Sequence, residues 1–254
     1  MVSQFALSGL LIGMVLGWSA IMPQSKAATL VTSRSELNAN DQLDWSSVGT
    51  PFNPFGPPDP AAFLPNSFTV DSAGGSAIQV GIPAATIPGV FPPFIFQTTD
   101  PGIPTNFASG DFILFTGLIP GPPPAVGNPG PITLTFADPV AAVGAQLAVD
   151  DIFSFTGTVS AFDVSGQLLD SFSLPGTSST ALDNSAIFLG ISDDQARISS
   201  IAFQSSIPNS AIGINQLSFL SAQADVPEPS LLVGLAVLSV TVASSRQKKR
   251  SFNV

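Results

Sequence analysis

The 254-residue sequence contains no cysteine, no histidine and no tyrosine. These absences exclude zinc fingers, other Cys/His metal sites, Ser-His-Asp triads and Cys-His dyads, because each needs side chains that this chain does not have. Glu36 is the only glutamate between residues 28 and 225, so general acid–base chemistry has few candidate groups. We therefore expect a protein that is not an enzyme, with no catalytic residues.

Positive charge is also scarce. Seven Lys and Arg residues stand against 17 Asp and Glu residues, which gives a net charge of −10. Nucleic-acid binding depends on a cationic face that displaces counterions from phosphates, so we expect no nucleic-acid partner. Charged residues make up only 9% of the chain and hydrophobic residues 44%, a balance that favours a folded core over disorder.

Two long apolar runs are present, one at each end of the chain. The first covers residues 5–21, and Ser25 and Ala27 follow it as small residues at the −3 and −1 positions of a secretory cleavage site. We expect residues 1–27 to form a signal peptide that is cleaved after Ala27. Residues 1–4 carry no Lys or Arg, so an uncleaved N-terminal membrane helix is the alternative.

The second apolar run, residues 231–245, lies between a Pro-Glu-Pro motif and a basic end. The motif is Pro227, Glu228 and Pro229, and the basic residues are Arg246, Lys248, Lys249 and Arg250. As a helix the run would be about 22 Å long, which is short for a permanent membrane span of about 20 residues. The basic residues favour the cytoplasmic side of the membrane.

This order of motif, apolar helix and basic end in residues 226–250 resembles the PEP-CTERM sorting signal of Gram-negative bacteria and cyanobacteria. The resemblance implies that an exosortase-type membrane protease is a partner and cuts at Pro227, Glu228 and Pro229. It also implies export to the cell envelope or the extracellular space, with transient membrane anchoring by the C-terminal helix. An ordinary C-terminal anchor is the alternative, and both interpretations place residues 28–225 outside the cytoplasmic membrane.

Residues 28–225 are expected to form one ectodomain, whose stability must come from its core because no disulfide can form. Within it, residues 51–131 hold 18 of the 24 prolines, which predicts long loops rather than central strands or helices. Phenylalanines within these proline-rich stretches are expected to attach the loops to a core: Phe52, Phe55, Phe63, Phe91 and Phe94.

Residues 131–220 contain the most regular strand patterns, with apolar and polar residues alternating between turn residues. Ser165 and Gly166 predict a tight hairpin turn, and the phase of Ile198 predicts a β-bulge or a strand shared between two faces. Strands are predicted at residues 66–70, 77–80, 111–116, 132–136, 143–149, 155–162, 168–174, 186–191, 197–203 and 211–219. The fold class is therefore predicted to be all-β, an antiparallel β-sandwich that is jelly-roll-like, with proline-rich loops and a flanking helix at each end.

Several stretches within residues 40–220 also resemble an ectodomain that recurs in PEP-CTERM proteins. They include DQLDWSSVG (41–49), ITLTFADPVAAVGAQL (132–147) and FTGTVSAFDVSGQLLDSFSL (155–174). No activity is assigned to that ectodomain, so the resemblance supports the β-sandwich and the exported location and leaves function open.

Two kinds of ligand site remain to be considered. Calcium prefers carboxylate, amide and carbonyl oxygens, and several aspartates are expected at strand ends: Asp150, Asp151, Asp183, Asp193 and Asp194. The alternative, that these residues form turns and add solubility, is favoured, so no cofactor is expected and Ca²⁺ is the one left open. Trp45 is the one tryptophan in residues 28–225 and is interpreted as a core or edge anchor rather than a sugar platform.

The sequence therefore predicts a non-enzymatic, exported surface or extracellular-matrix protein that is sorted by its C-terminal signal. The alternative is a carbohydrate-binding module, with or without calcium. Exopolysaccharide or envelope glycans are the ligands expected in that case.

Overall fold

The computed structural model describes residues 27–53, 56–57, 59–99, 105–121, 125–151 and 154–221. The two expected flanking helices, in residues 1–27 and 226–250, lie outside the described residues apart from Ala27. In the described part the fold is all-β, as predicted, with three short 3₁₀ helices: η1 (Arg34–Leu37), η2 (Trp45–Ser47) and η3 (Pro60–Ala62). No helix among the described residues is both long enough and apolar enough to span a membrane.

The strands pair in antiparallel fashion throughout the described residues. In chain order they are β1 (Thr29–Val31), β2 (Asp41–Leu43), β3 (Ser67–Asp71), β4 (Ala77–Gly81), β5 (Phe94–Gln97), β6 (Phe112–Phe115), β7 (Ile132–Val149), β8 (Ser154–Phe162), β9 (Leu168–Thr177), β10 (Ile187–Ser192), β11 (Ile198–Ser205), β12 (Ile212–Ile214) and β13 (Leu217–Ser221).

The long strand β7 is shared by two layers. Its first half pairs with β4 and β11, and its second half pairs with β10 on one edge and with β12 and β13 on the other. Residues 137–139 between the halves are exposed, and the register between β7 and β11 shifts there. Pro139 has no N–H to donate to a neighbouring strand, so this position suits a break in the ladder.

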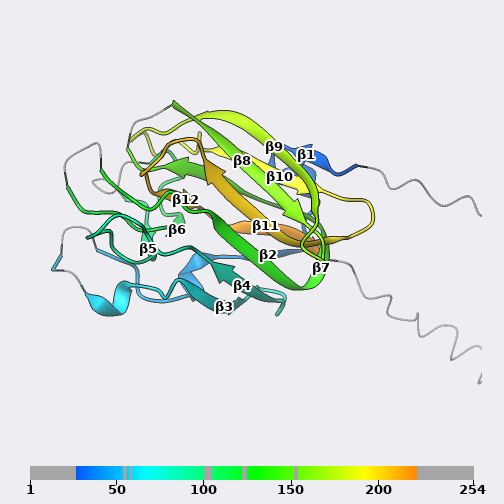
Figure 1. The fold of residues 1–254 in the computed structure, drawn as a ribbon, viewed down its shortest axis with the longest axis horizontal. Coiled ribbons are helices and arrows are strands. Elements are labelled where there is room, and N and C mark those ends of the chain that lie inside the picture. The colour runs from blue at the N-terminus through cyan, green and yellow to red at the C-terminus, as the bar shows by residue number, and fades with distance from the viewer. Residues whose placement is uncertain are drawn as a thin grey trace, which may run out of the picture.

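One layer therefore has the order β3-β4-β7-β11-β8-β9, and the other contains β1, β10, β7, β12 and β13, with β2, β6 and β5 beyond them. The strands β8, β9 and β11 lie side by side, and β5 and β6 lie at one end of the molecule (Figure 1). The main core is the apolar cluster between the layers. At Gly157 of β8, for example, an added Cβ would lie within 2.9 Å of Leu147 on β7 and Leu189 on β10.

The regular strands were predicted well, but two connections were wrong. The stretches 132–136 and 143–149 were expected as separate strands, and the structure joins them in β7. The stretch 211–219 was expected as one strand, and Asn215 and Gln216 divide it into β12 and β13. The short strands β1, β2 and β5 were not predicted, because three or four residues are too few to show an alternating pattern.

Two local predictions of backbone geometry are confirmed. The turn between β8 and β9 contains Gly166 at φ 79°, and the N–H of Asp163 donates to the carbonyl of Gln167. The bulge predicted near Ile198 is present as a register shift between Ile198 and Ser200.

The proline-rich segments are attached to a second core of aromatic rings. Phe52 and Phe94 are buried, with ring centroids 4.7 Å apart, and Phe63 and Phe91 pack on them. The attachment predicted for these phenylalanines is confirmed, while Phe55 lies outside the described residues. Aromatic pairs at these distances stabilise the loops that proline prevents from pairing as central strands.

A third, small core lies around η1. Val31, Leu37 and Ala142 are buried together, and Phe188 and Leu220 pack against them. Through Leu37 these contacts hold η1 against β7, and η1 begins with Arg34, the residue on which the candidate site depends.

The approach of β7 to β10 generates a stability prediction. Gly144 lies opposite Gly190, and a Cβ added at Gly144 would lie 2.8 Å from the Cα of Gly190 and 2.8 Å from the Phe188 ring. We expect Gly144→Ala to lower the free energy of unfolding by about 1–3 kcal/mol, because the backbones would have to separate. Chemical denaturation of the full chain measures the change.

Gly81 provides the matched control for that substitution. It lies in β4, and nothing lies within 4 Å of a Cβ added there. Gly81→Ala should change the free energy of unfolding by no more than about 0.5 kcal/mol. Equal losses in the two variants would contradict the proposed close packing at Gly144.

Candidate functional site

Trp45 is fully buried, and its indole N–H donates to the backbone carbonyl of Asn215 over 2.8 Å. The prediction that Trp45 is an anchor rather than a sugar platform is confirmed. Because Asn215 lies where β12 and β13 are interrupted, Trp45 also fixes the backbone at one wall of the cavity described next.

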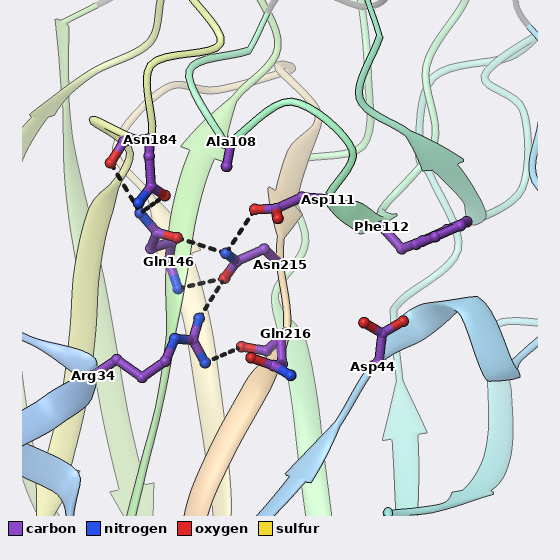
Figure 2. Close-up of a pocket in the computed structure, with 9 residues that line it drawn as sticks. All are labelled: Arg34, Asp44, Ala108, Asp111, Phe112, Gln146, Asn184, Asn215 and Gln216. Carbon is purple, nitrogen blue, oxygen red and sulfur yellow. Dashed lines mark hydrogen bonds between the residues drawn. The ribbon is translucent and has the colours of Figure 1, made fainter.

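That cavity is a polar pocket of about 290 Å³ at the junction of several segments (Figure 2). Four of its lining residues carry carboxamide side chains, two carry carboxylates and one is an arginine. The full lining is Arg34, Asp44, Ala108, Asp111, Phe112, Gln146, Asn184, Asn215 and Gln216.

The side chain of Asn215 organises the pocket. Its Oδ1 accepts a hydrogen bond from Arg34 Nη2 over 3.0 Å and another from the backbone N–H of Gln146 over 3.0 Å. Its Nδ2 donates to Asp111 Oδ2 over 3.1 Å and to the side-chain carbonyl of Gln146. Figure 2 shows Asp111 and Arg34 meeting Asn215 from opposite sides. One buried carboxamide thus uses both of its polar atoms to join η1, β7 and the residue before β6.

Arg34 is held in the pocket by uncharged acceptors. Besides its bond to Asn215, Nη1 donates to the carbonyl of Gln216 over 2.8 Å and to the hydroxyl of Ser218. Its guanidinium also lies 5.4 Å from the centroid of the Phe188 ring, within the range of a cation–π contact. Burial lowers the pKa of Arg34 and the charge of Asp111 partly offsets this, but an arginine stays protonated at neutral pH.

Several polar atoms of the lining are left without a hydrogen bond to the described residues. Asp111 uses only Oδ2, and Asp44 uses only Oδ1, which accepts from the N–H of Ser46 over 2.8 Å. The side-chain amide of Gln216 and the Nδ2 of Asn184 have no partner among the described residues, whereas the Oδ1 of Asn184 accepts from Gln146 over 2.9 Å. The pocket therefore offers unused acceptors and donors to a ligand.

The structure places the aspartates considered for calcium at separate positions. Asp150 and Asp151 end β7 and are buried, and Asp151 accepts from the N–H of Ala125. Burial and the neighbouring charge of Asp151 raise the pKa of Asp150 to about 7.

Asp183 and Asp193 have partners elsewhere in the fold. Asp183 accepts from the N–H of Ser185 over 3.1 Å, and hydrogen bonds from Ser185 lower its pKa. Asp193 is buried and forms an ion pair with Arg197 at 2.6 Å. Its burial raises its pKa, but hydrogen bonds from Arg197 and Gln195 outweigh this effect and lower the pKa overall.

Asp193 and Asp194 line a second cavity of about 350 Å³, together with Glu36. Among the described residues no group of three or more His, Cys, Asp or Glu side chains could hold a metal ion. The aspartates considered for calcium are thus not gathered in one place.

The residues predicted for processing mostly lie outside the described part of the chain. This holds for Ser25, for the motif Pro227, Glu228 and Pro229, and for the basic residues Arg246, Lys248, Lys249 and Arg250. Ala27 is described and is exposed.

Sequence reasoning did not find the polar pocket. Its key residues, Arg34, Asp111, Gln146 and Asn215, are spread over much of the chain and share no motif. Two signals were available: Arg34 is one of only two basic residues in residues 28–225, and Asn215-Gln216 interrupts an apolar strand pattern.

Comparison with known proteins leaves the chain without an assigned family. No protein-family model matches it, and no curated protein matches it either. Among solved structures it is similar to the crystal structure of a DUF4465 family protein from Bacteroides caccae, with 13% sequence identity and a TM-score of 0.39. That match covers 76% of this chain and 100% of the other chain.

The hydrogen bonds of Asn215 generate a prediction about stability. Asn215→Ala should lower the free energy of unfolding by about 2–4 kcal/mol, because it leaves Nη2 of Arg34 and the backbone N–H of Gln146 without their acceptor. Gln204 is exposed, and no hydrogen bond joins its side chain to the described residues, so Gln204→Ala is the control. Chemical denaturation should show no loss for the control, and a similarly small change at Asn215 would contradict its organising role.

Asp150 generates a prediction about pH. Its pKa is about 7 in the folded protein and about 3.9 in an unfolded chain. Between these values the folded state holds a proton that the unfolded state has lost, so stability contributed by Asp150 falls as pH rises from about 4 to about 7. Asp150→Asn should remove this fall, on the order of 2–4 kcal/mol.

Denaturation at several pH values measures that slope. Asp71 is exposed, and no hydrogen bond joins its side chain to the described residues, so Asp71→Asn should keep the slope of the parent protein. An unchanged slope in Asp150→Asn would show that the carboxyl of Asp150 is charged throughout this range.

Proposed function

We propose that this chain is a non-enzymatic protein of the cell envelope or extracellular matrix, exported through its N-terminal signal and sorted by its C-terminal signal. One observation carries the proposal: the first described strand begins directly after the expected cleavage site. Ala28 is buried at 5% exposure and β1 starts at Thr29, while Ala27 is exposed. A signal peptidase cutting after Ala27 would leave every described strand of the sheet in place.

The proposed partner at the C-terminus is an exosortase-type membrane protease. The last described strand, β13, ends at Ser221, and the motif at Pro227 to Pro229 follows it in the sequence. Proline cannot donate a hydrogen bond to a strand and does not continue a helix, which favours an extended, accessible motif. We also propose that the two layers have jelly-roll-like connectivity and that residues 231–245 anchor the precursor in the membrane.

The polar pocket favours a second candidate function, carbohydrate binding. Sugar sites present planar amides and carboxylates that exchange hydrogen bonds with hydroxyl groups, and four carboxamides and two carboxylates line this cavity. Envelope glycans or exopolysaccharide are the proposed ligands, and Ca²⁺ remains a proposed aid rather than a requirement. A glycan array with and without Ca²⁺, followed by a hydrolysis assay on any bound glycan, would separate binding from catalysis.

The sorting signal is tested by changing Pro227, Glu228 and Pro229 together to alanine. In a host that has an exosortase, we expect the variant to accumulate in the membrane as a precursor that retains Arg250. The folded domain should keep the protease resistance of the parent, because none of the described contacts involves the motif. Immunoblotting of fractions and mass spectrometry of both termini measure the result, and the new N-terminus should be Ala28.

Ser230→Ala is the control, since it changes a neighbouring residue and leaves the motif intact. It should be processed like the parent. If the triple-alanine variant were also processed and exported normally, the motif would be a linker and the C-terminus an ordinary anchor.

A further inference from the structure

We propose that the polar pocket binds one uncharged, hydroxyl-rich sugar residue, and that its carboxylates Asp44 and Asp111 exclude uronic acids. This inference rests on the second candidate function and defines its ligand class. It follows from the size, the charge and the unused hydrogen-bonding atoms of the cavity.

The size of the pocket limits what it can hold. Its volume of about 290 Å³ lies just below the range of about 300–1,000 Å³ for ligand pockets. A cavity of this size suits one sugar ring rather than a long oligosaccharide. In an exopolysaccharide it would take a terminal residue or a side branch.

The charge of the pocket disfavours an anionic ligand. The charged groups in its lining are Arg34, Asp44 and Asp111, which sum to one negative charge. The hydrogen bonds of Arg34 within the pocket go to uncharged acceptors of the protein, so its guanidinium is already largely occupied. A second carboxylate brought beside Asp44 and Asp111 would meet like charge at close range, which opposes binding.

The unused polar atoms fit hydroxyl groups. Asp111 Oδ1 and Asp44 Oδ2 can each accept from a hydroxyl, and the Gln216 amide can both donate and accept. The pocket is also lined by the half-buried residue Phe112, which adds an apolar side chain to its polar groups. The several hydroxyl groups of one sugar can donate to both aspartates, whereas an ionised carboxylate has no proton to donate.

Trp45 provides a built-in reporter of binding. Its indole N–H donates to the carbonyl of Asn215, whose side chain lines the cavity, so a ligand there should shift the indole resonance. The full chain has two tryptophans, and Trp18→Phe leaves Trp45 as the only indole. We would use this full-length variant, labelled with ¹⁵N, in a detergent that has no sugar head group.

The titration compares D-glucose, D-galactose and D-mannose with glucuronate and galacturonate. We expect at least one neutral hexose to shift the Trp45 signal saturably, and its uronate to bind about tenfold more weakly. A short oligosaccharide of the same sugar separates a polymer ligand from a free one: a pocket for one residue predicts an affinity within about tenfold of the monosaccharide. An affinity for the uronate equal to or higher than that for the neutral sugar would overturn the proposed ligand class.

Substitutions test whether the two carboxylates set this preference. Asp44→Asn keeps the capping bond to Ser46, and Asp111→Asn keeps an acceptor for Asn215. The double variant should lose most of the discrimination between neutral sugar and uronate, a change that a purely structural role would not cause. Asp71→Asn, outside the pocket, should leave the discrimination as in the parent.

Two further outcomes are decisive. If no sugar shifts the Trp45 signal while the protein is folded, the pocket is not a sugar site. That result would leave export and sorting intact, because these are measured by the termini of the processed protein. If processing failed while sugar binding stayed normal, the proposal of export and sorting would fall and the sugar site would stand.

Discussion

The hydrogen bonds of β7 are the constraint on which both layers depend. Its two halves pair with different neighbours, so one strand ties β4 and β11 to β10, β12 and β13. The change of partners occurs around Pro139, where the ladder is interrupted and the register with β11 shifts. Because no disulfide can form in this chain, the shared strand and the apolar cluster between the layers must supply the cohesion that cystines supply in disulfide-bonded domains.

The polar pocket is a consequence of a second interruption. Asn215 and Gln216 interrupt the strand between β12 and β13. The buried indole N–H of Trp45 donates to the backbone carbonyl of Asn215 and so fixes the backbone at this interruption. At this gap the carboxamide of Asn215 stands where a continuous ladder of backbone hydrogen bonds would otherwise run. Arg34 and Asp111 reach the carboxamide from opposite sides, so the break in the sheet becomes a polar cavity with charges held apart.

The predictable part of the fold is where local pattern and tertiary contacts agree. The alternation in β8 and β9, the turn at Gly166 and the bulge at Ile198 are visible in sequence, because each depends on nearby residues. The union of two stretches in β7 was not visible, because Pro139 signals a break and only the neighbouring strands carry the ladder past it. The calcium hypothesis named residues by their strand-end positions, but their partners, such as Arg197 for Asp193, are set by the folded chain.

The sequence by itself determined the all-β class, the acidic and cysteine-free character of the chain, and the burial of phenylalanines in its proline-rich segments. These properties follow from composition and short-range alternation, which fix the number and kind of side chains available for a core. Only the tertiary structure decided that Arg34, Asp111, Gln146 and Asn215 share one cavity and that Asp150 keeps a proton near neutral pH. Both depend on burial and on distances between residues remote in the chain, which no local pattern encodes.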